Sequence, residues 1–302
     1  MRALVTGGTG FVGSNLVGQL AKKGIEVLVT GNESEQQLPD RSNVKRLYPS
    51  VFGIDWSKVG KIDVLFHEAA LNETTNLDAD EMLFGNYEVS KRLFQKVISE
   101  GCRHIVYASS TAVYGDAPAP YLEGGLKNPL NPYAESKLKL DAFAMGLAAS
   151  RPDVKVVGLR YCNVYGPGEN HKGKRASMVH QIAKQVAAGK NPKLFKWGEQ
   201  KRDYIYVKDV VQANLLAAEA DESCVVNCGF GQATSFKHLT DIIKKGLGSD
   251  VEIEYIDNPY SGIYQNHTEC DMSLAKEMIG FVPAYDIEAG IRDALSYASF
   301  LK

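Results

Sequence analysis

Short apolar runs alternate with longer amphipathic stretches through the first half of the chain. The apolar runs have the length and composition of buried strands, and they cover residues 3–5, 25–30, 43–48, 62–66, 104–108 and 154–159. The amphipathic stretches have helical periodicity and cover residues 11–23, 80–100 and 132–149. Strands that alternate with helices are joined by right-handed crossovers. The pattern therefore predicts an α/β fold with a doubly wound parallel sheet.

The alternation loosens after about Tyr161, where Gly, Pro and charged residues predict a functional loop over residues 163–175. Further helices are predicted at residues 177–188, 209–219 and 236–247, and further strands at residues 204–207 and 224–228. No linker separates the two halves, so we expect a smaller, interleaved α/β lobe. The predicted division places residues 1–168 and a returning segment, 204–233, in the sheet domain, with residues 169–203 and 234–302 in the smaller one.

Four glycines follow the first strand: Gly7, Gly8 and Gly10 precede the first helix, and Gly13 lies in its first turn. Glycine is required where a Cβ would obstruct a tight turn, a bound phosphate or the packing of helix on strand. The free N–H groups of a helix N-terminus and its dipole hold an anion. We therefore predict that this turn, with Phe11 and Val12, binds the diphosphate of a dinucleotide.

Charge and cysteine usage exclude several classes of protein. The chain of 302 residues has a net charge of −2, which argues against a general nucleic-acid binder. No apolar run approaches membrane-spanning length, so we expect no membrane partner. The chain starts with a predicted strand, so we expect no leader and a cytoplasmic location. The five cysteines are scattered, so we expect reduced thiols and no metal site.

Tyr133 and Lys137 are four residues apart, on one face of a predicted helix. A free tyrosine has a pKa of about 10, too high for a base at neutral pH. A nearby ammonium, together with a nicotinamide cation, would lower that pKa. The polar residues Ser109, Ser110 and Thr111 follow a strand, and their hydroxyls could orient a substrate oxygen.

Six segments resemble the extended short-chain dehydrogenases/reductases, in the group of nucleotide-sugar epimerases and dehydratases. In chain order they are TGGTGFVGSN, FHEAA, YASSTAVYG, YAESK, RYCNVYGP and KRDYIYVKDV. The resemblance implies a Rossmann domain and one NAD or NADP per subunit. It also implies a nucleotide-diphosphate sugar as substrate and a homodimer or higher homo-oligomer.

The resemblance implies roles for individual residues. Tyr133 corresponds to the acid/base, Lys137 to the residue that holds the nicotinamide ribose, and Ser110 to the residue that polarises the reacting hydroxyl. Beyond the glycine turn and the Tyr133–Lys137 pair, the expected cofactor contacts are Asn32, Val51, Ala69, Ala70 and Asn86. The expected substrate contacts are Ser109, Ser110, Thr111, Asn163, Lys172, Arg202 and Tyr264.

Three longer segments are similar to the ADP-heptose 6-epimerase branch of this family. They begin at Phe66, Arg160 and Asn191. The similarity implies that tightly bound cofactor oxidises the sugar to a ketone and then reduces it again. Lys172 would be a second acid/base on the opposite face of the sugar. Alternatively, Lys172 pairs with a substrate phosphate or lies in solvent.

Other activities stay open. A UDP-hexose 4-epimerase would use Ser110 and Tyr133 without needing Lys172, and a dehydrogenase of a nucleotide-linked heptose would release reduced cofactor. A 4,6-dehydratase is disfavoured because Thr111-Ala112 occupies the place of its acidic pair. A silent NAD(P)-binding scaffold is also disfavoured, because the tyrosine and lysine are both present.

The chain departs from the family at three places. No carboxylate follows the second strand near Gly31. A carboxylate there would repel the 2′-phosphate of NADP, so its absence makes NADP acceptable as a cofactor. The third strand ends at residues 48–51 without the aspartate that contacts adenine in relatives. Ile263 stands where the heptose epimerases have arginine, which suggests a different sugar or base. We expect His67 and Cys162 to have packing roles.

Overall fold

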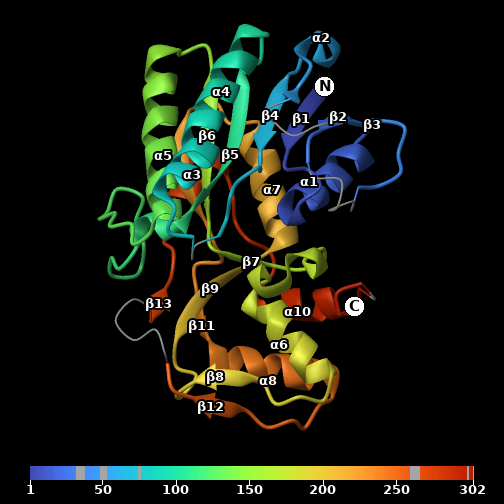
Figure 1. Cartoon of the computed structure of the whole chain (residues 1–302), viewed down its shortest axis with the longest axis vertical. Coiled ribbons are helices and arrows are strands. Elements are labelled where there is room, and N and C mark those ends of the chain that lie inside the picture. Colours follow the sequence, from blue (N-terminus) through green and yellow to red (C-terminus); the bar gives the residue numbers. More distant parts are fainter. Residues whose placement is uncertain (32–37, 48–52, 74–75, 259–265, 298, 302) are drawn as a thin grey trace.

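The computed structural model describes residues 1–31, 38–47, 53–73, 76–258, 266–297 and 299–301. Its larger lobe contains a seven-stranded sheet in which every neighbouring pair of strands is parallel. The strands, in their order across the sheet, are β10 (Cys224–Cys228), β6 (Lys155–Tyr161), β5 (His104–Ser110), β4 (Val64–His67), β1 (Arg2–Thr6), β2 (Glu26–Val29) and β3 (Val44–Arg46) (Figure 1). The doubly wound fold is therefore confirmed. The strand order reverses between β1 and β4, where such sheets bind ligands at their carboxyl edge.

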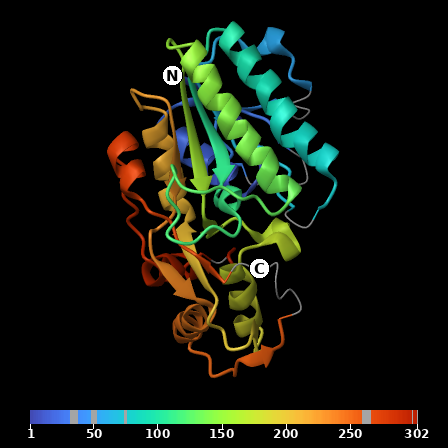
Figure 2. The same cartoon turned by 90° about the vertical axis from the view of Figure 1, so that its left-hand side faces the viewer.

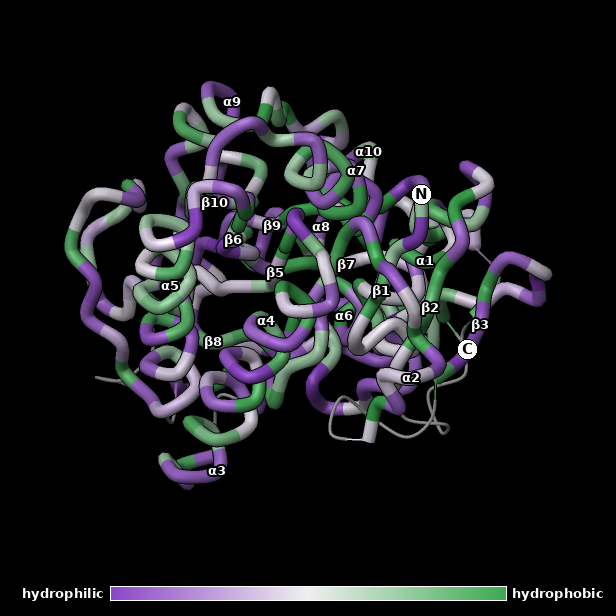
Figure 3. The backbone as a smooth tube through the Cα atoms, turned by 90° about the horizontal axis from the view of Figure 1, so that it is seen from above, coloured by the Kyte–Doolittle hydropathy of each residue, from purple (hydrophilic) through white to green (hydrophobic). Residues whose placement is uncertain are grey.

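Helices cover both faces of the large sheet because the strand residues alternate between two cores. Ala3 and Val5 point to a core with helices α1 (Phe11–Lys22), α7 (Val207–Ala217) and α9 (Ser273–Ile279). Leu4 points to the opposite core, with helices α2 (Trp56–Val59), α4 (Val89–Ser99) and α5 (Pro132–Ser150). Figure 3 shows the hydrophobic stretches gathered along the central strands.

The helix predicted over residues 80–100 contains a change of helical type. α3 (Ala79–Leu83) continues through a π-helical segment, Phe84–Glu88, into α4. Asn86 in this segment is buried, and its side-chain amide bonds both the N–H and the carbonyl of Leu71, at 2.8 and 2.9 Å. The π turn thus fixes the loop that follows β4, and it matches the tendency of such turns to mark functional sites.

The smaller lobe lies beyond the carboxyl ends of the large sheet, towards which β5 and β6 point in Figure 2. Its main strand, β9 (Lys201–Tyr206), pairs with three others, namely β7 (Asn163–Tyr165), β11 (Ala233–Ser235) and β13 (His267–Thr268). A two-stranded sheet joins β8 (Lys193–Phe195) to β12 (Glu254–Ile256). The helices α6 (Met178–Ala187), α8 (Phe236–Leu247) and α10 (Ile287–Leu295) share its core.

Strand pairing bears on the predicted division of the chain. Segment 204–233 contains α7 and β10, which pack and pair in the large lobe, and it begins inside β9, which pairs in the small lobe. β7, which we grouped with the first domain, also pairs with β9. The two lobes therefore share strands at their junction.

Among the described residues, no helix combines the length and hydropathy of a bilayer span.

A buried ion pair ties α5 to β6. The Arg160 Nε lies 2.9 Å from Asp141 Oδ2, and both side chains are 4% exposed. Tyr107 donates a hydrogen bond to the other carboxylate oxygen. We expect Asp141→Ala to reduce the free energy of unfolding in urea by about 3–5 kcal/mol, because it leaves a buried cation unpaired. Asp153→Ala, which removes the exposed partner of Arg151, should change it little. Equal effects of the two substitutions would contradict this assignment.

Candidate active site

A cavity of about 740 Å³ lies at the carboxyl edge of the large sheet. This volume is typical of a small-molecule site. Its wall contains the glycine turn, the ends of β4 and β5, the start of α5 and a segment of the loop after β7. The structure brings these predicted residues together around it: Gly7, Gly10, Phe11, Val12, Gly13, Ala69, Ala70, Ser109, Ser110, Tyr133, Lys137 and Lys172.

The glycine turn has room for backbone atoms only. A Cβ on Gly7, which has a φ of +66°, would lie 2.7 Å from the backbone nitrogen of Ala69. A Cβ on Gly13 would lie 2.2 Å from the carbonyl oxygen of Gly7. No side chain caps α1, whose N-cap is Gly10, so its first N–H groups remain available to an anion.

Three buried hydroxyls around the turn have no hydrogen-bond partner among the residues that the structure describes. They belong to Thr9, Thr30 and Ser109, and all three residues line the cavity. Buried polar groups are usually paired, so these three indicate a polar ligand. Together with the glycine turn, they fit a dinucleotide cofactor.

Helix α5 presents Tyr133 and Lys137 to the cavity. Asn131 caps the helix by accepting the N–H of Ala134 at 2.9 Å. The Lys137 ammonium is buried, donates to the carbonyl of Ala108 at 2.8 Å and lies 5.9 Å from the centre of the Tyr133 ring. Burial lowers the pKa of Lys137 to about 8 against the opposing effect of nearby carboxylates.

The pKa of Tyr133 is raised above its ordinary value by burial, with a smaller contribution from the charge of Asp141. A hydrogen bond with Ser110 acts in the opposite direction and is outweighed. Our prediction concerned Lys137 together with a nicotinamide cation, and it stays a prediction.

His67 and Glu68 follow one another at the end of β4 but differ in role. The ring nitrogens of His67 bond the hydroxyls of Thr6 and Ser90, both at 2.7 Å. Burial lowers the pKa of His67 to about 3, so the ring is neutral, as suits the packing role that we expected. Glu68 lines the cavity, accepts a hydrogen bond from Tyr161 at 3.0 Å, and has a pKa raised to about 7 by burial.

Our sequence analysis did not single out Glu68. The available signal was its position in the polar tail of a buried strand, next to the two alanines that we assigned to the cofactor. Carboxyl ends of parallel strands carry functional side chains in such folds.

Lys172 lies in the cavity wall. Its ammonium is 4.9 Å from the centre of the Phe11 ring and 3.7 Å from Glu169 Oε2. Its side chain is 17% exposed, and burial lowers its pKa. Glu169 is fully buried and accepts the N–H groups of Gly166 and Ser177. Of the alternatives that the sequence left open, location in solvent is excluded.

Four predicted residues do not line the cavity and instead bond neighbouring parts of the protein. Asn86 bonds Leu71, and the Thr111 hydroxyl donates to the carbonyl of Tyr161. The Asn163 amide donates to the carbonyl of Asp203 at 2.8 Å, and the Arg202 guanidinium lies 5.6 Å from the Phe236 ring. Their predicted contacts with cofactor or substrate stay predictions. Asn32, Val51, Ile263 and Tyr264 lie outside the described residues.

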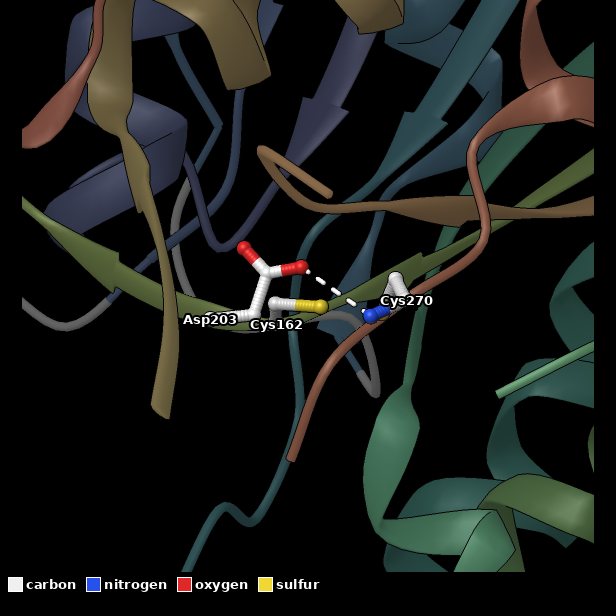
Figure 4. Close-up of side chains that lie close together, drawn as sticks. All are labelled: Cys162, Asp203 and Cys270. Atoms are coloured by element: carbon white, nitrogen blue, oxygen red, sulfur yellow. Dashed lines mark hydrogen bonds between the residues drawn. The ribbon is translucent and has the colours of Figure 1, made fainter. Parts of the chain in front are cut away.

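Cys162, Asp203 and Cys270 form a buried cluster whose possible ligand atoms lie within 4.8 Å of one another (Figure 4). The Asp203 carboxylate accepts backbone N–H groups of Cys270 and Phe230, at 3.1 and 2.8 Å. Burial raises the pKa of both thiols. Backbone donors thus already engage the carboxylate, and we interpret the cluster as packing between β9 and the chain before α9.

Substitution of Gly13 tests the role of the turn. We expect Gly13→Ala to weaken binding of a nicotinamide dinucleotide about tenfold or more, because the added Cβ collides with backbone. Gly18→Ala is the matched control, since a Cβ there meets nothing within 4 Å. Calorimetric titration with the dinucleotide measures both affinities. Similar affinities for the two variants would contradict the assignment.

Residues 3–229 match the family described as the NAD dependent epimerase/dehydratase family. The Helicobacter pylori ADP-L-glycero-D-manno-heptose-6-epimerase is similar at 36% identity, with a TM-score of 0.86, over 98% of this chain and 95% of that one.

Two UDP-sugar epimerases are also similar over 98% of this chain. The UDP-N-acetylglucosamine 4-epimerase of Methanobrevibacter ruminantium is 28% identical, with a TM-score of 0.90 and 97% of its chain covered. The UDP-glucose 4-epimerase of Thermotoga maritima is 28% identical, with a TM-score of 0.88 and 98% of its chain covered. The matched segment spans the glycine turn, Tyr133 and Lys137, so the chain belongs to the NAD-dependent epimerase/dehydratase family.

Proposed function

We propose that this protein is a nucleotide-sugar epimerase that oxidises its substrate transiently to a keto-sugar and then reduces it to the epimer. The proposal depends on the convergence of Ser110, Tyr133 and Lys137 on the cavity that the glycine turn opens. NAD, when bound, supplies the chemistry of accepting and returning a hydride.

Ser110, Tyr133 and Lys137 have different roles in removing the proton from the sugar hydroxyl. Ser110 holds the reacting oxygen of the sugar, while Tyr133 takes the hydroxyl proton as the C–H bond breaks. Lys137 adds positive charge beside the phenolate that acts as base. Since burial raises the pKa of Tyr133, positive charge that enters the cavity would favour the phenolate. Proton removal is thereby coupled to the presence of oxidised cofactor.

Our specific proposal is inversion at C6 of an ADP-linked heptose. It is supported by 36% identity to a heptose 6-epimerase and by the place of Lys172 in the cavity wall. A 6-epimerase needs proton exchange on both faces of the keto-sugar. Tyr133 serves one face, and Lys172, whose pKa is lowered by burial, would serve the other.

Tyr133→Phe separates catalysis from cofactor binding. The variant keeps the ring but lacks the hydroxyl, so we expect NAD to stay bound while turnover falls about 10²–10⁴-fold. Tyr255→Phe, in the small lobe, is the control and should retain full activity. Bound NAD is measured by absorbance after denaturation, and turnover by NMR of the sugar. Unimpaired turnover of Tyr133→Phe would overturn its assigned role.

The substrate is tested by mixing purified protein with ADP-D-glycero-D-manno-heptose, without added cofactor, and following the C6 proton by NMR. We expect inversion at C6, abolished in Lys172→Met and retained in Lys174→Met, whose side chain is exposed. No inversion by NAD-loaded protein would refute the heptose assignment. Inversion of a UDP-hexose at C4 by Lys172→Met would identify a 4-epimerase instead.

A further inference from the structure

Glu68 has unused capacity to accept hydrogen bonds. It lines the cavity at the end of β4, directly beneath the glycine turn, where a Cβ on Gly7 would lie 2.9 Å from its carbonyl carbon. Among the described residues, no Lys, Arg or His nitrogen lies within 4.0 Å of its carboxylate. A carboxylate offers about four acceptor positions. Tyr161 fills only part of that capacity, with its hydroxyl 3.0 and 3.2 Å from the two oxygens.

A relay of hydrogen bonds fixes the direction of the Tyr161 proton. The Asn214 amide donates to the Tyr161 hydroxyl at 2.7 Å and also donates to the carbonyl of Val210. Since the phenol accepts from Asn214, it gives its single proton to Glu68. Glu68 is therefore held as an acceptor, with the rest of its capacity available to the cavity.

Glu68 and Lys137, the residue that we assign to the nicotinamide ribose, line the same cavity. Each group acts on the charge of the other: Lys137 lowers the pKa of Glu68, and Glu68 raises that of Lys137. The nicotinamide end of NAD brings an amide that donates hydrogen bonds and, in the oxidised form only, a positive charge. These are the two features that a partly buried carboxylate recognises when it has lone pairs that no described residue fills.

We propose that Glu68 is a cofactor-binding residue that accepts a hydrogen bond from the nicotinamide end of NAD and favours NAD⁺ over NADH by its charge. A site that favours NAD⁺ returns the hydride readily to the keto-sugar. Glu68 would thus favour re-reduction of the keto-sugar to the epimer over its release in the oxidised form. This inference deepens the proposed function, but the binding assignment rests only on the family's NAD and not on the identity of the sugar.

A structural role makes a different prediction. If Glu68 serves only to pack β4 against β6 through Tyr161, its replacement weakens NAD⁺ and NADH binding alike. If its charge faces the nicotinamide, replacement changes the ratio of the two affinities. The ratio is therefore the decisive quantity.

The experiment is calorimetric titration of cofactor-stripped protein with NAD⁺ and with NADH at pH 8, without sugar. We expect Glu68→Gln, which keeps an acceptor oxygen but loses the charge, to weaken NAD⁺ binding about tenfold. NADH binding should change less than about twofold, because the reduced ring is uncharged. An unchanged ratio of dissociation constants would overturn the proposal.

Two further variants serve as a control and as an alternative replacement. Glu81→Gln removes an exposed carboxylate from the same cavity wall and should leave the ratio unchanged, because solvent screens that charge. Glu68→Met is the replacement to measure if Glu68→Gln fails to fold. It removes the charge without introducing an amide, and we expect the same shift in the ratio. Since no sugar is present, the outcome is independent of whether the heptose assignment survives.

Discussion

The turn between β1 and α1 admits only backbone atoms, and the position of the remaining site residues depends on that restriction. Gly7 lies against the backbone of Glu68 and Ala69, and Gly13 lies against Gly7 itself. The end of β4 is therefore held directly beneath the N-terminus of α1. Gly7 and Gly13 thus set the position of Glu68, which follows Gly7 by sixty-one residues in the chain, relative to the start of α1.

Burial is the largest cause of the shifted pKa values around the cavity. It lowers the pKa of Lys137 and Lys172, raises that of Glu68, and raises that of Tyr133. Each shift favours the neutral form of the group. A cation in the cavity would favour the charged forms of Glu68 and Tyr133, whereas an anion would favour those of Lys137 and Lys172. The protonation states around the cavity therefore depend on the charge of whatever binds there.

Much of the large lobe could be predicted because its signals are local. Strand runs, the glycine turn and the start of α5 at Pro132 are read from neighbouring residues, and the structure has them where the sequence indicated. The π turn at Phe84–Glu88 could not be predicted this way, because it accompanies a hydrogen bond between Asn86 and Leu71, which are distant in the sequence. Short strands of the small lobe, such as β8, lack a readable period. Glu68 and the raised pKa of Tyr133 depend on burial, which only the folded chain determines.

The place of Lys172 is set by α1, the helix that follows the glycine turn, as well as by its own loop. Asn15 of α1 donates to the carbonyl of Pro167 at 3.0 Å and to that of Phe11 at 2.9 Å, so the loop before Lys172 is held at the start of that helix. Buried Glu169 then fixes the following segment through Ser177. The protein's own hydrogen bonds therefore hold Lys172 beside the glycine turn, so a residue in the middle of the chain and the turn at its start line the same cavity.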